Sequence, residues 1–368
     1  RCSCYVPPMA QATHPVHGRG AQSGAVPTRF GLATREADGD WLDVAEEIDG
    51  AGPKLRTTVT EERPKTIVTF NRSPDIAFDR SINAYRGCEH GWIYCFARPT
   101  HAYHDLSPGL DFETKLFAKP NAAELLRATL AHPRYKSAPI AMGTNTDPYQ
   151  PIEDRYRITR SVLEVCLETR HPVTITTKSA RVLRDLDLLI ELARLNLVAV
   201  GLSVTSLDPK LSGLLEPRAS APAKRLAALG GLVEANVPAH ALIAPVIPAI
   251  TDEFMEAIVA RVAALGVQSV GWILLRLPHE VAPLFREWLA IHFPERAGKV
   301  MSIVRSIREG RDNDPNFFSR MRPKGVWAEL FRARFETACR RSGIPQTRFE
   351  LDCGAFLRPS PNGQLSLL

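Results

Sequence analysis

The sequence predicts an α/β fold, a partial (β/α)6 TIM-like barrel with a C-terminal helical extension. Three observations predict it. From about residue 64, short β-rich runs alternate with stretches of helical periodicity, a spacing that is typical of a parallel sheet. Several of the apolar runs end in polar or proline-rich turns, as strands do at the rim of such a barrel. The 368 residues, 45% of them hydrophobic, are enough for one large domain with a buried core.

Six runs have the composition of parallel strands, and five helical patterns lie between them. The expected strands are Ile82–Tyr85, Ile140–Gly143, Val173–Thr176, Val198–Val204, Ala239–Ala244 and Val270–Leu275. The expected helices are Ala122–Ala131, Thr159–Thr169, Val182–Leu195, Ala221–Ala235 and Asp252–Leu265. Right-handed crossovers place the carboxyl ends of all parallel strands on one face, so we expect the polar loops to meet there.

The chain divides into four expected parts. Residues 1–60 show no sustained period and are rich in Gly, Pro and Ala, which predicts a flexible N-terminal arm. Residues 61–277 form the barrel core, and residues 278–345 form the helical extension, which we expect to cap or plug the open barrel. Residues 346–368 are expected to be a tail.

The charge balance is mildly basic. Lys and Arg number 46 against 40 Asp and Glu, a net charge of +6. This balance favours anionic partners such as nucleic acid or phosphorylated metabolites only weakly, because the basic residues are scattered. No window approaches the roughly 20 consecutive apolar residues of a membrane span, and no leader pattern opens the chain. We therefore expect a cytoplasmic monomer.

The seven cysteines favour reduced thiols and possible metal ligation over a disulfide framework. Cys166 and Cys339 fall inside helical patterns and are expected to be buried small hydrophobes. Cys353 is isolated near the C-terminus, where a thiol could donate hydrogen or have no role. Cys88 and Cys95 stand in a loop after the first expected strand, where metal chemistry is the leading interpretation.

Residues 86–99 read Arg-Gly-Cys-Glu-His-Gly-Trp-Ile-Tyr-Cys-Phe-Ala-Arg-Pro. Thiolates are soft anionic donors that suit iron, and a cluster with one open iron takes three of them from the protein. This loop resembles the cysteine loop of the radical S-adenosylmethionine (SAM) superfamily, in the branch similar to spore photoproduct lyase and described as DNA-repair-photolyase-like. Residues 79–83, 143–149, 177–179 and 276–280 also resemble that branch, and the likeness extends over about residues 60–345.

The resemblance implies two cofactors, a 4Fe-4S cluster and SAM. Cys88 and Cys95 would ligate the cluster, which supplies one electron to break a C–S bond of SAM. The resulting 5′-deoxyadenosyl radical abstracts hydrogen from a substrate, while the protein positions the groups and excludes water. The resemblance also implies an electron donor such as flavodoxin or ferredoxin, and it leaves a nucleic-acid substrate open.

Trp92 departs from the family pattern, because it stands where the middle cysteine of the family triad is expected. An indole has an N–H donor and no lone pair for a metal. Three explanations remain open: a single-base change from a cysteine codon, a degenerate homologue that keeps the barrel, and a variant cluster in which His90 supplies a nitrogen. Cys88 and Cys95 could also be unrelated thiols.

The resemblance assigns cofactor-binding roles to residues at several strand ends. Tyr94 would pack near the adenine of SAM, with core packing as the alternative. The residues that would receive the amino group are Gly143, Thr144, Asn145 and Asp147. These four residues could instead form an Asp-Pro turn.

Further strand ends complete the expected SAM site. Lys178 and Ser179 would hold the carboxylate and ribose, and Ser203 would face the ribose. Val246 and Ile247 would form an apolar shelf for adenine, with core packing as the alternative.

Arg276, His279 and Glu280 follow the last expected strand and are candidate catalytic residues that would bind substrate or move protons. A surface pair of Arg276 with Glu280 is the plain alternative.

Three functions compete at this stage. The leading one is a radical SAM enzyme, lyase-like, with an unidentified substrate. The second is a catalytically degenerate relative that acts as a binding module, which Trp92 favours. The third is a zinc protein using Cys88, Cys95 and His90, although their spacing differs from that of most zinc sites.

Overall fold

The computed structural model describes residues 16, 18–24, 55–345 and 348–360. Most of the expected arm, including Cys2 and Cys4, and the end of the expected tail lie outside the described residues. Within these ranges, none of the helices has the length and apolar character that a membrane crossing requires.

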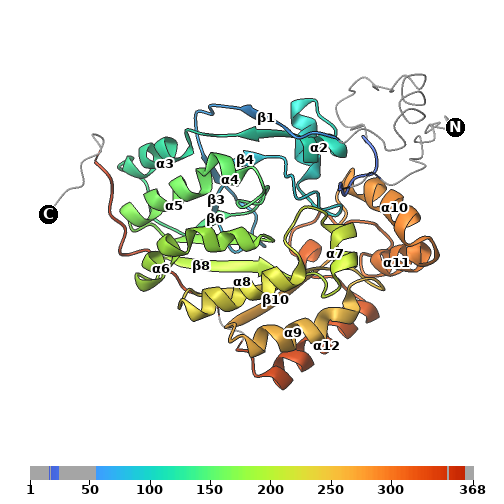
Figure 1. The fold of residues 1–368 in the computed structure, drawn as a ribbon. Coiled ribbons are helices and arrows are strands. Elements are labelled where there is room, and N and C mark those ends of the chain that lie inside the picture. The colour runs from blue at the N-terminus through green and yellow to red at the C-terminus, as the bar shows by residue number, and fades with distance from the viewer. Residues whose placement is uncertain (1–15, 17, 25–54, 346–347, 361–368) are drawn as a thin grey trace.

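The main sheet has seven strands in the order β10-β9-β8-β7-β6-β3-β2. They are β2 (Val68–Phe70), β3 (Arg80–Ile82), β6 (Ile140–Met142), β7 (Val173–Thr177), β8 (Val198–Ser203), β9 (Ala239–Val246) and β10 (Ser269–Leu274). Neighbours from β3 to β10 run parallel, and β2 pairs antiparallel with β3. The six parallel strands lie side by side in the order in which they occur along the chain. This arrangement confirms the predicted partial barrel (Figure 1).

The first predicted strand is displaced. The parallel strand β3 ends at Ile82, and residues Tyr85–Arg86 form β4 of a second sheet, whose order is β1-β5-β4. In that sheet β4 pairs antiparallel with β5 (Lys115–Ala118), which runs parallel to β1 (Thr58–Glu61). The chain therefore changes sheets just before the cysteine loop, because Tyr85 pairs with Ala118 instead of continuing β3.

Helices cover the outer face of the main sheet. The five between successive parallel strands are α3 (Ala122–Ala131), α5 (Ile158–Glu168), α6 (Leu186–Arg194), α8 (Pro222–Glu234) and α9 (Met255–Ala264). The predicted helix Val182–Leu195 is divided into a 3-10 turn, Ala180–Asp185, and α6. Shorter helices lie in the loops: α2 (Leu110–Thr114), α4 (Glu153–Tyr156) and α7 (Pro209–Leu215).

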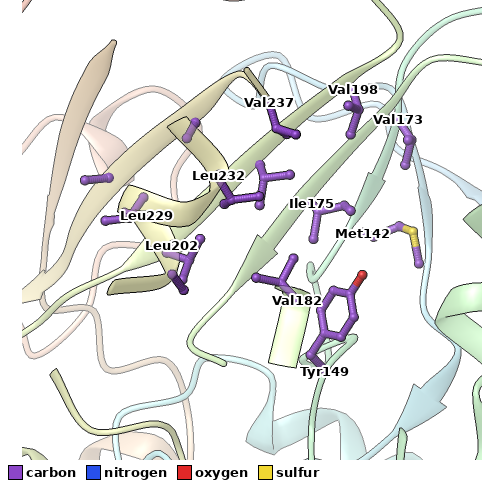
Figure 2. Close-up of a cluster of buried hydrophobic side chains, with 14 of the residues drawn as sticks. Met142, Tyr149, Val173, Ile175, Val182, Val198, Leu202, Leu229, Leu232 and Val237 are labelled. Atoms are coloured by element: carbon purple, nitrogen blue, oxygen red, sulfur yellow. The ribbon is translucent and has the colours of Figure 1, made fainter. Parts of the chain in front are cut away.

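The largest core lies between the sheet and these helices. Val173 and Ile175 of β7 and Leu202 of β8 are fully buried in it, and Leu229 and Leu232 of α8 pack in the same cluster (Figure 2). Every residue of β8 is buried, as expected for a central parallel strand. The rigid sheet fixes the positions of the loops at its carboxyl edge.

The C-terminal extension has two parts with different partners. Helices α10 (Val281–His292) and α11 (Pro294–Ser306) share a second core cluster with Ile93 and Tyr94 of the cysteine loop. They therefore cover the carboxyl edge, as expected of a cap. Helix α12 (Val326–Ser342) packs against α9 instead and extends the outer helical layer.

Candidate active site

The cysteine loop follows β4 and brings its two thiols into one buried cluster. Cys88 and Cys95 are 3% and 7% exposed and pack together with Phe112 and Trp92. The Cys88 amide donates to the Phe112 carbonyl at 2.9 Å, which ties the loop to α2. Gly87 has φ 71°, and a Cβ there would lie 2.8 Å from the same carbonyl, so the loop requires glycine at this position.

Burial raises the pKa of both thiols. The Cys88 pKa rises well above its ordinary value through burial, with further increases from the charges of Asp147 and Cys95. The Cys95 pKa also rises through burial. Both shifts favour the neutral thiol over the thiolate.

Trp92 fills the space beside the thiols. Its ring stacks on His90 at 5.9 Å between centroids, and the Lys178 ammonium lies 5.1 Å from the indole centroid. The buried indole Nε1 has no hydrogen-bond acceptor within the described part of the chain. The indole therefore packs against the cluster that holds Cys88 and Cys95 without contributing a metal ligand.

The Asp147 carboxylate makes several polar contacts at the carboxyl edge of the sheet. Its carboxylate accepts hydrogen bonds from the Thr177 hydroxyl at 2.6 Å and from the Lys178 amide at 2.8 Å. His90 Nδ1 lies 3.3 Å from the second carboxylate oxygen. Burial alone would raise the Asp147 pKa, but His90 and these hydrogen bonds outweigh it and lower the pKa. Asp147 thus joins the loops after β6 and β7 to the cysteine loop.

Lys178 belongs to a buried ion network. Its ammonium donates to the Ala244 carbonyl at 2.7 Å and lies 3.2 Å from a Glu216 oxygen. Glu216 also bonds to the Arg225 guanidinium and to the Tyr94 hydroxyl. Burial alone would raise the Glu216 pKa, but the two cations outweigh it and lower the pKa to about 2. The Glu216 carboxylate therefore joins Lys178, at the end of β7, to Tyr94 of the cysteine loop, and Lys178 extends the network to β9.

The loop after β6 makes a tight approach to β7. Gly143 has φ 90°, and a Cβ there would meet the Thr176 carbonyl oxygen at 2.0 Å, so only glycine fits. The Thr144 hydroxyl and the Asn145 amide both bond to the Asn83 side chain, and Asn145 is exposed.

The remaining predicted cofactor residues are buried. The Ser179 side chain caps the following 3-10 turn, accepting from the Arg181 amide at 3.3 Å, and the Ser203 carbonyl accepts from Arg225. Val246 and Ile247 are fully buried in core clusters. Val246 and Ile247 thus show core packing, and the roles of all four residues toward SAM stay predictions.

The three predicted catalytic residues follow β10 and differ in exposure. Arg276 is half-buried and donates to the Met321 sulfur at 3.3 Å. His279 is exposed, with φ 49°, and Glu280 is buried directly before α10. Their catalytic role stays a prediction.

An N-terminal segment supports the cysteine loop, in a region expected to be a flexible arm. The amides of Gly20 and Ala21 donate to the Glu113 carboxylate at 3.0 and 2.8 Å, and Glu113 also pairs with Arg98. Arg98 in turn donates to the Trp92 carbonyl at 2.8 Å. Residues 19–22 are buried and lie over the loop, next to α10 in Figure 1. The expected arm therefore includes a packed segment.

Comparisons with known proteins decide the family. The family model described as Radical SAM superfamily matches residues 82–262, from the end of β3 into α9. This chain belongs to the radical SAM superfamily. An uncharacterized protein of Mycobacterium tuberculosis is 36% identical over 241 residues, which cover 64% of this chain and 71% of that protein. One from Methanocaldococcus jannaschii is 30% identical over 171 residues, covering 46% and 61%.

Solved structures share the fold of this radical SAM chain. A point mutant of spore photoproduct lyase superposes with a TM-score of 0.59 at 14% identity, covering 80% of this chain and 82% of that one. A second mutant of that enzyme gives 0.56 at 12% identity, with 78% and 80% covered. At this identity the likeness concerns the fold.

Radical SAM membership implies a 4Fe-4S cluster and SAM, and the donor set tests the fit of the cluster. Cys88 and Cys95 supply two thiols, and the third place holds an indole without a lone pair. Across the described ranges no three His, Cys, Asp or Glu side chains are grouped to hold a metal ion, His90 included. The residues present therefore do not fit a three-thiolate cluster. The hypothesis of a zinc site made by Cys88, Cys95 and His90 gains no support either.

Sequence reasoning missed the residues that organise this radical SAM site. Glu216 follows α7 and Glu113 lies in α2, and neither falls in a motif. Tyr94 and Glu216 are 122 positions apart, and Gly20 and Glu113 are 93 apart. A buried acid that pairs across such distances leaves no local pattern in a single sequence.

Proposed function

We propose that the protein binds SAM at the carboxyl edge of the barrel and that its reaction class is the reductive cleavage of SAM to start radical chemistry. The observation that supports this most is the convergence of strand ends on the cysteine loop. Asp147 after β6 and Lys178 after β7 both contact that loop, through His90 and Trp92. In an α/β barrel this edge is where ligands bind.

The charged side chains at this edge would hold one another in position rather than be free to pair with a ligand. Asp147 and Glu216 hold Lys178 by its amide and ammonium, so the Lys178 charge is directed at Trp92 and Tyr94. The Asn145 side chain is exposed on the β6 loop, where it could meet a ligand. We propose that this loop receives the amino group of SAM, and that α10 and α11 exclude water from the edge.

Trp92 favours a second candidate function, in which the protein is a SAM-binding module without radical chemistry. Two thiols beside an indole do not complete the cluster on which the cleavage depends. We propose that position 92 decides between the two functions: the chain with Trp92 binds SAM and holds little iron, and a cysteine there restores the family's site.

An anaerobic comparison of three proteins tests this proposal. The unchanged chain, Trp92→Cys and Trp92→Phe are titrated with SAM by calorimetry, then reduced and assayed for 5′-deoxyadenosine. We expect all three to bind SAM and only Trp92→Cys to release 5′-deoxyadenosine. Failure of all three to bind SAM would refute the binding role, and equal release by the unchanged chain would refute the role of position 92.

We propose a nucleic acid as the substrate class to test first and flavodoxin or ferredoxin as the electron donor. The net charge of +6 is compatible with a polyanion. A spore photoproduct lyase mutant of similar fold, TM-score 0.52, has a dinucleoside spore photoproduct bound. Binding that weakens steeply with added salt is expected if phosphates are contacted, and a flat response would argue against it.

A further inference from the structure

Two arginines beside the last barrel strand have buried donors that find no acceptor among the described residues. Arg308, just past the end of α11, is 4% exposed. Its Nη2 donates to the Leu275 carbonyl at 2.7 Å and its Nη1 to the Arg320 carbonyl at 3.4 Å. Its Nε is buried with no partner among the described residues.

Arg276 lies two residues after β10, and it too has a buried donor that lacks an acceptor among the described residues. Its Nη1 reaches only the Met321 sulfur, a weak acceptor, and its Nε is buried without a partner in the described part of the chain. Burial lowers the pKa of Arg308 to about 10, and the charge of Arg276 lowers it further in the same direction. The pKa of Arg276 is lowered by burial and by the charge of Arg320. The guanidinium groups thus repel one another in a desolvated place.

The carboxylates near Arg276 and Arg308 already accept hydrogen bonds from other groups. Asp75 accepts both prongs of Arg320, at 2.6 and 2.7 Å, and the Phe318 amide at 3.0 Å. Asp314 accepts the Asn316 amide at 2.9 Å. In the described ranges, neither Arg276 nor Arg308 has a carboxylate within ion-pair distance. Asp75 and Asp314 therefore soften the positive potential without neutralising it.

We infer that Arg276 and Arg308 form an anion site for a phosphoryl group, separate from the SAM site. A buried charged donor without an acceptor is destabilising, and folded proteins seldom leave one unpaired. The planar arginine fork matches the oxygens of a phosphate, which would satisfy both Nε groups and relieve the repulsion.

The surface beside Arg308 is small and carries both signs of charge. A small surface hollow over Arg308 is lined by Ser319, Arg322 and Lys324 and also by the acidic residues Glu309 and Asp314, and Lys324 pairs with Glu309. Phosphate oxygens accept from hydroxyl and guanidinium donors alike. The hollow measures only about 10 Å³, the room of one water molecule, so a phosphoryl group reaches Arg308 only if the side chains that line the hollow move apart.

The site lies where the open barrel is bridged. Sheet edges β10 and β2 are not paired with each other, and the segment after α11 spans them. It bonds to Leu275, next to β10, through Arg308 and to Asp75, between β2 and β3, through Arg320. Phe317 and Phe318 on this segment are 53% and 55% exposed. A phosphoryl group held here would fix a substrate at the lateral opening of the barrel.

Thermal unfolding with inorganic phosphate tests the site without SAM or iron. Phosphate is compared with potassium chloride at equal ionic strength, which removes general screening. We expect phosphate to raise the Tm of the unchanged chain, and Arg308→Gln and Arg276→Gln to weaken the phosphate affinity about tenfold or more. The control is Arg261→Gln, an exposed arginine of α9. Circular dichroism verifies that each variant is folded.

A charge-preserving variant and a competitor sharpen the result. Arg308→Lys keeps the charge and loses the fork, so it should retain only part of the phosphate response. Displacement of phosphate by a single-stranded oligonucleotide would assign the phosphoryl group to a nucleic-acid backbone, and lack of displacement would assign it to a small phosphorylated molecule. Equal responses of Arg308→Gln and Arg261→Gln, or no response beyond chloride, would overturn the site.

Discussion

The Lys178 ammonium lies over the Trp92 indole, 5.1 Å from the ring centroid, and the same ammonium is 3.2 Å from Glu216. A cation beside an indole face is attracted to it, which stabilises the ring in its buried position. Trp92 is thus integrated into the edge of the barrel in place of a metal ligand. The substitution is compatible with a folded site and incompatible with a full set of thiolates.

Replacing Glu216 by Gln should destabilise the fold by about 3–5 kcal/mol, because Lys178 and Arg225 would remain buried without their carboxylate. Urea unfolding measures the change. Glu191→Gln, at an exposed pair with Arg194, is the control and should cost less than about 1 kcal/mol. Equal losses in the two variants would contradict the network.

Gly20→Ala should detach the N-terminal segment from the cysteine loop. The added Cβ would lie 1.8 Å from the Gly91 carbonyl oxygen, so the two Glu113 hydrogen bonds of the segment would be lost. We expect a loss of about 2 kcal/mol and faster hydrogen exchange of the Cys88 amide. Gly24→Ala is the control, since its Cβ meets only a side-chain oxygen at 4.0 Å. If the hydrogen-exchange rate of the Cys88 amide is unchanged in Gly20→Ala, the N-terminal segment does not support the cysteine loop.

Acid should destabilise the protein through His171, which is fully buried between the Tyr135 hydroxyl and the Pro172 carbonyl. Burial lowers its pKa to about 4. The unfolded chain takes up the proton first, so the stabilisation is complete above about pH 6.5 and is lost as pH falls toward about 4. The loss is up to about 3 kcal/mol.

Urea unfolding between pH 7 and pH 4.5 checks this sign. His171→Gln should show a shallower decline in stability than the unchanged chain, while His132→Gln, at an exposed position, should show the same decline. A parallel decline in His171→Gln would exclude His171 as the cause.

The sequence predicted the parallel strands well because each is an apolar run that ends in a polar turn, as Val173–Thr177 does before Lys178. Strands β2 and β4 are too short for any period to show, so the second sheet and the shift of the first strand went unpredicted. Cys88 and Cys95 could be found from local spacing.

The rest of the site depends on contacts between distant residues. Lys178 was expected to hold a ligand, and the structure shows it held by Glu216, which only the three-dimensional arrangement reveals. The roles of the strand-end residues toward SAM and the four-part domain division stay predictions.

Iron content after anaerobic reconstitution tests most directly whether position 92 decides the chemistry of this site. Trp92→Cys should bind about four iron atoms per chain, the complement of one 4Fe-4S cluster. The unchanged chain and Trp92→Phe, which also lacks a thiol, should bind few. Equal iron and sulfide in all three proteins would contradict the account.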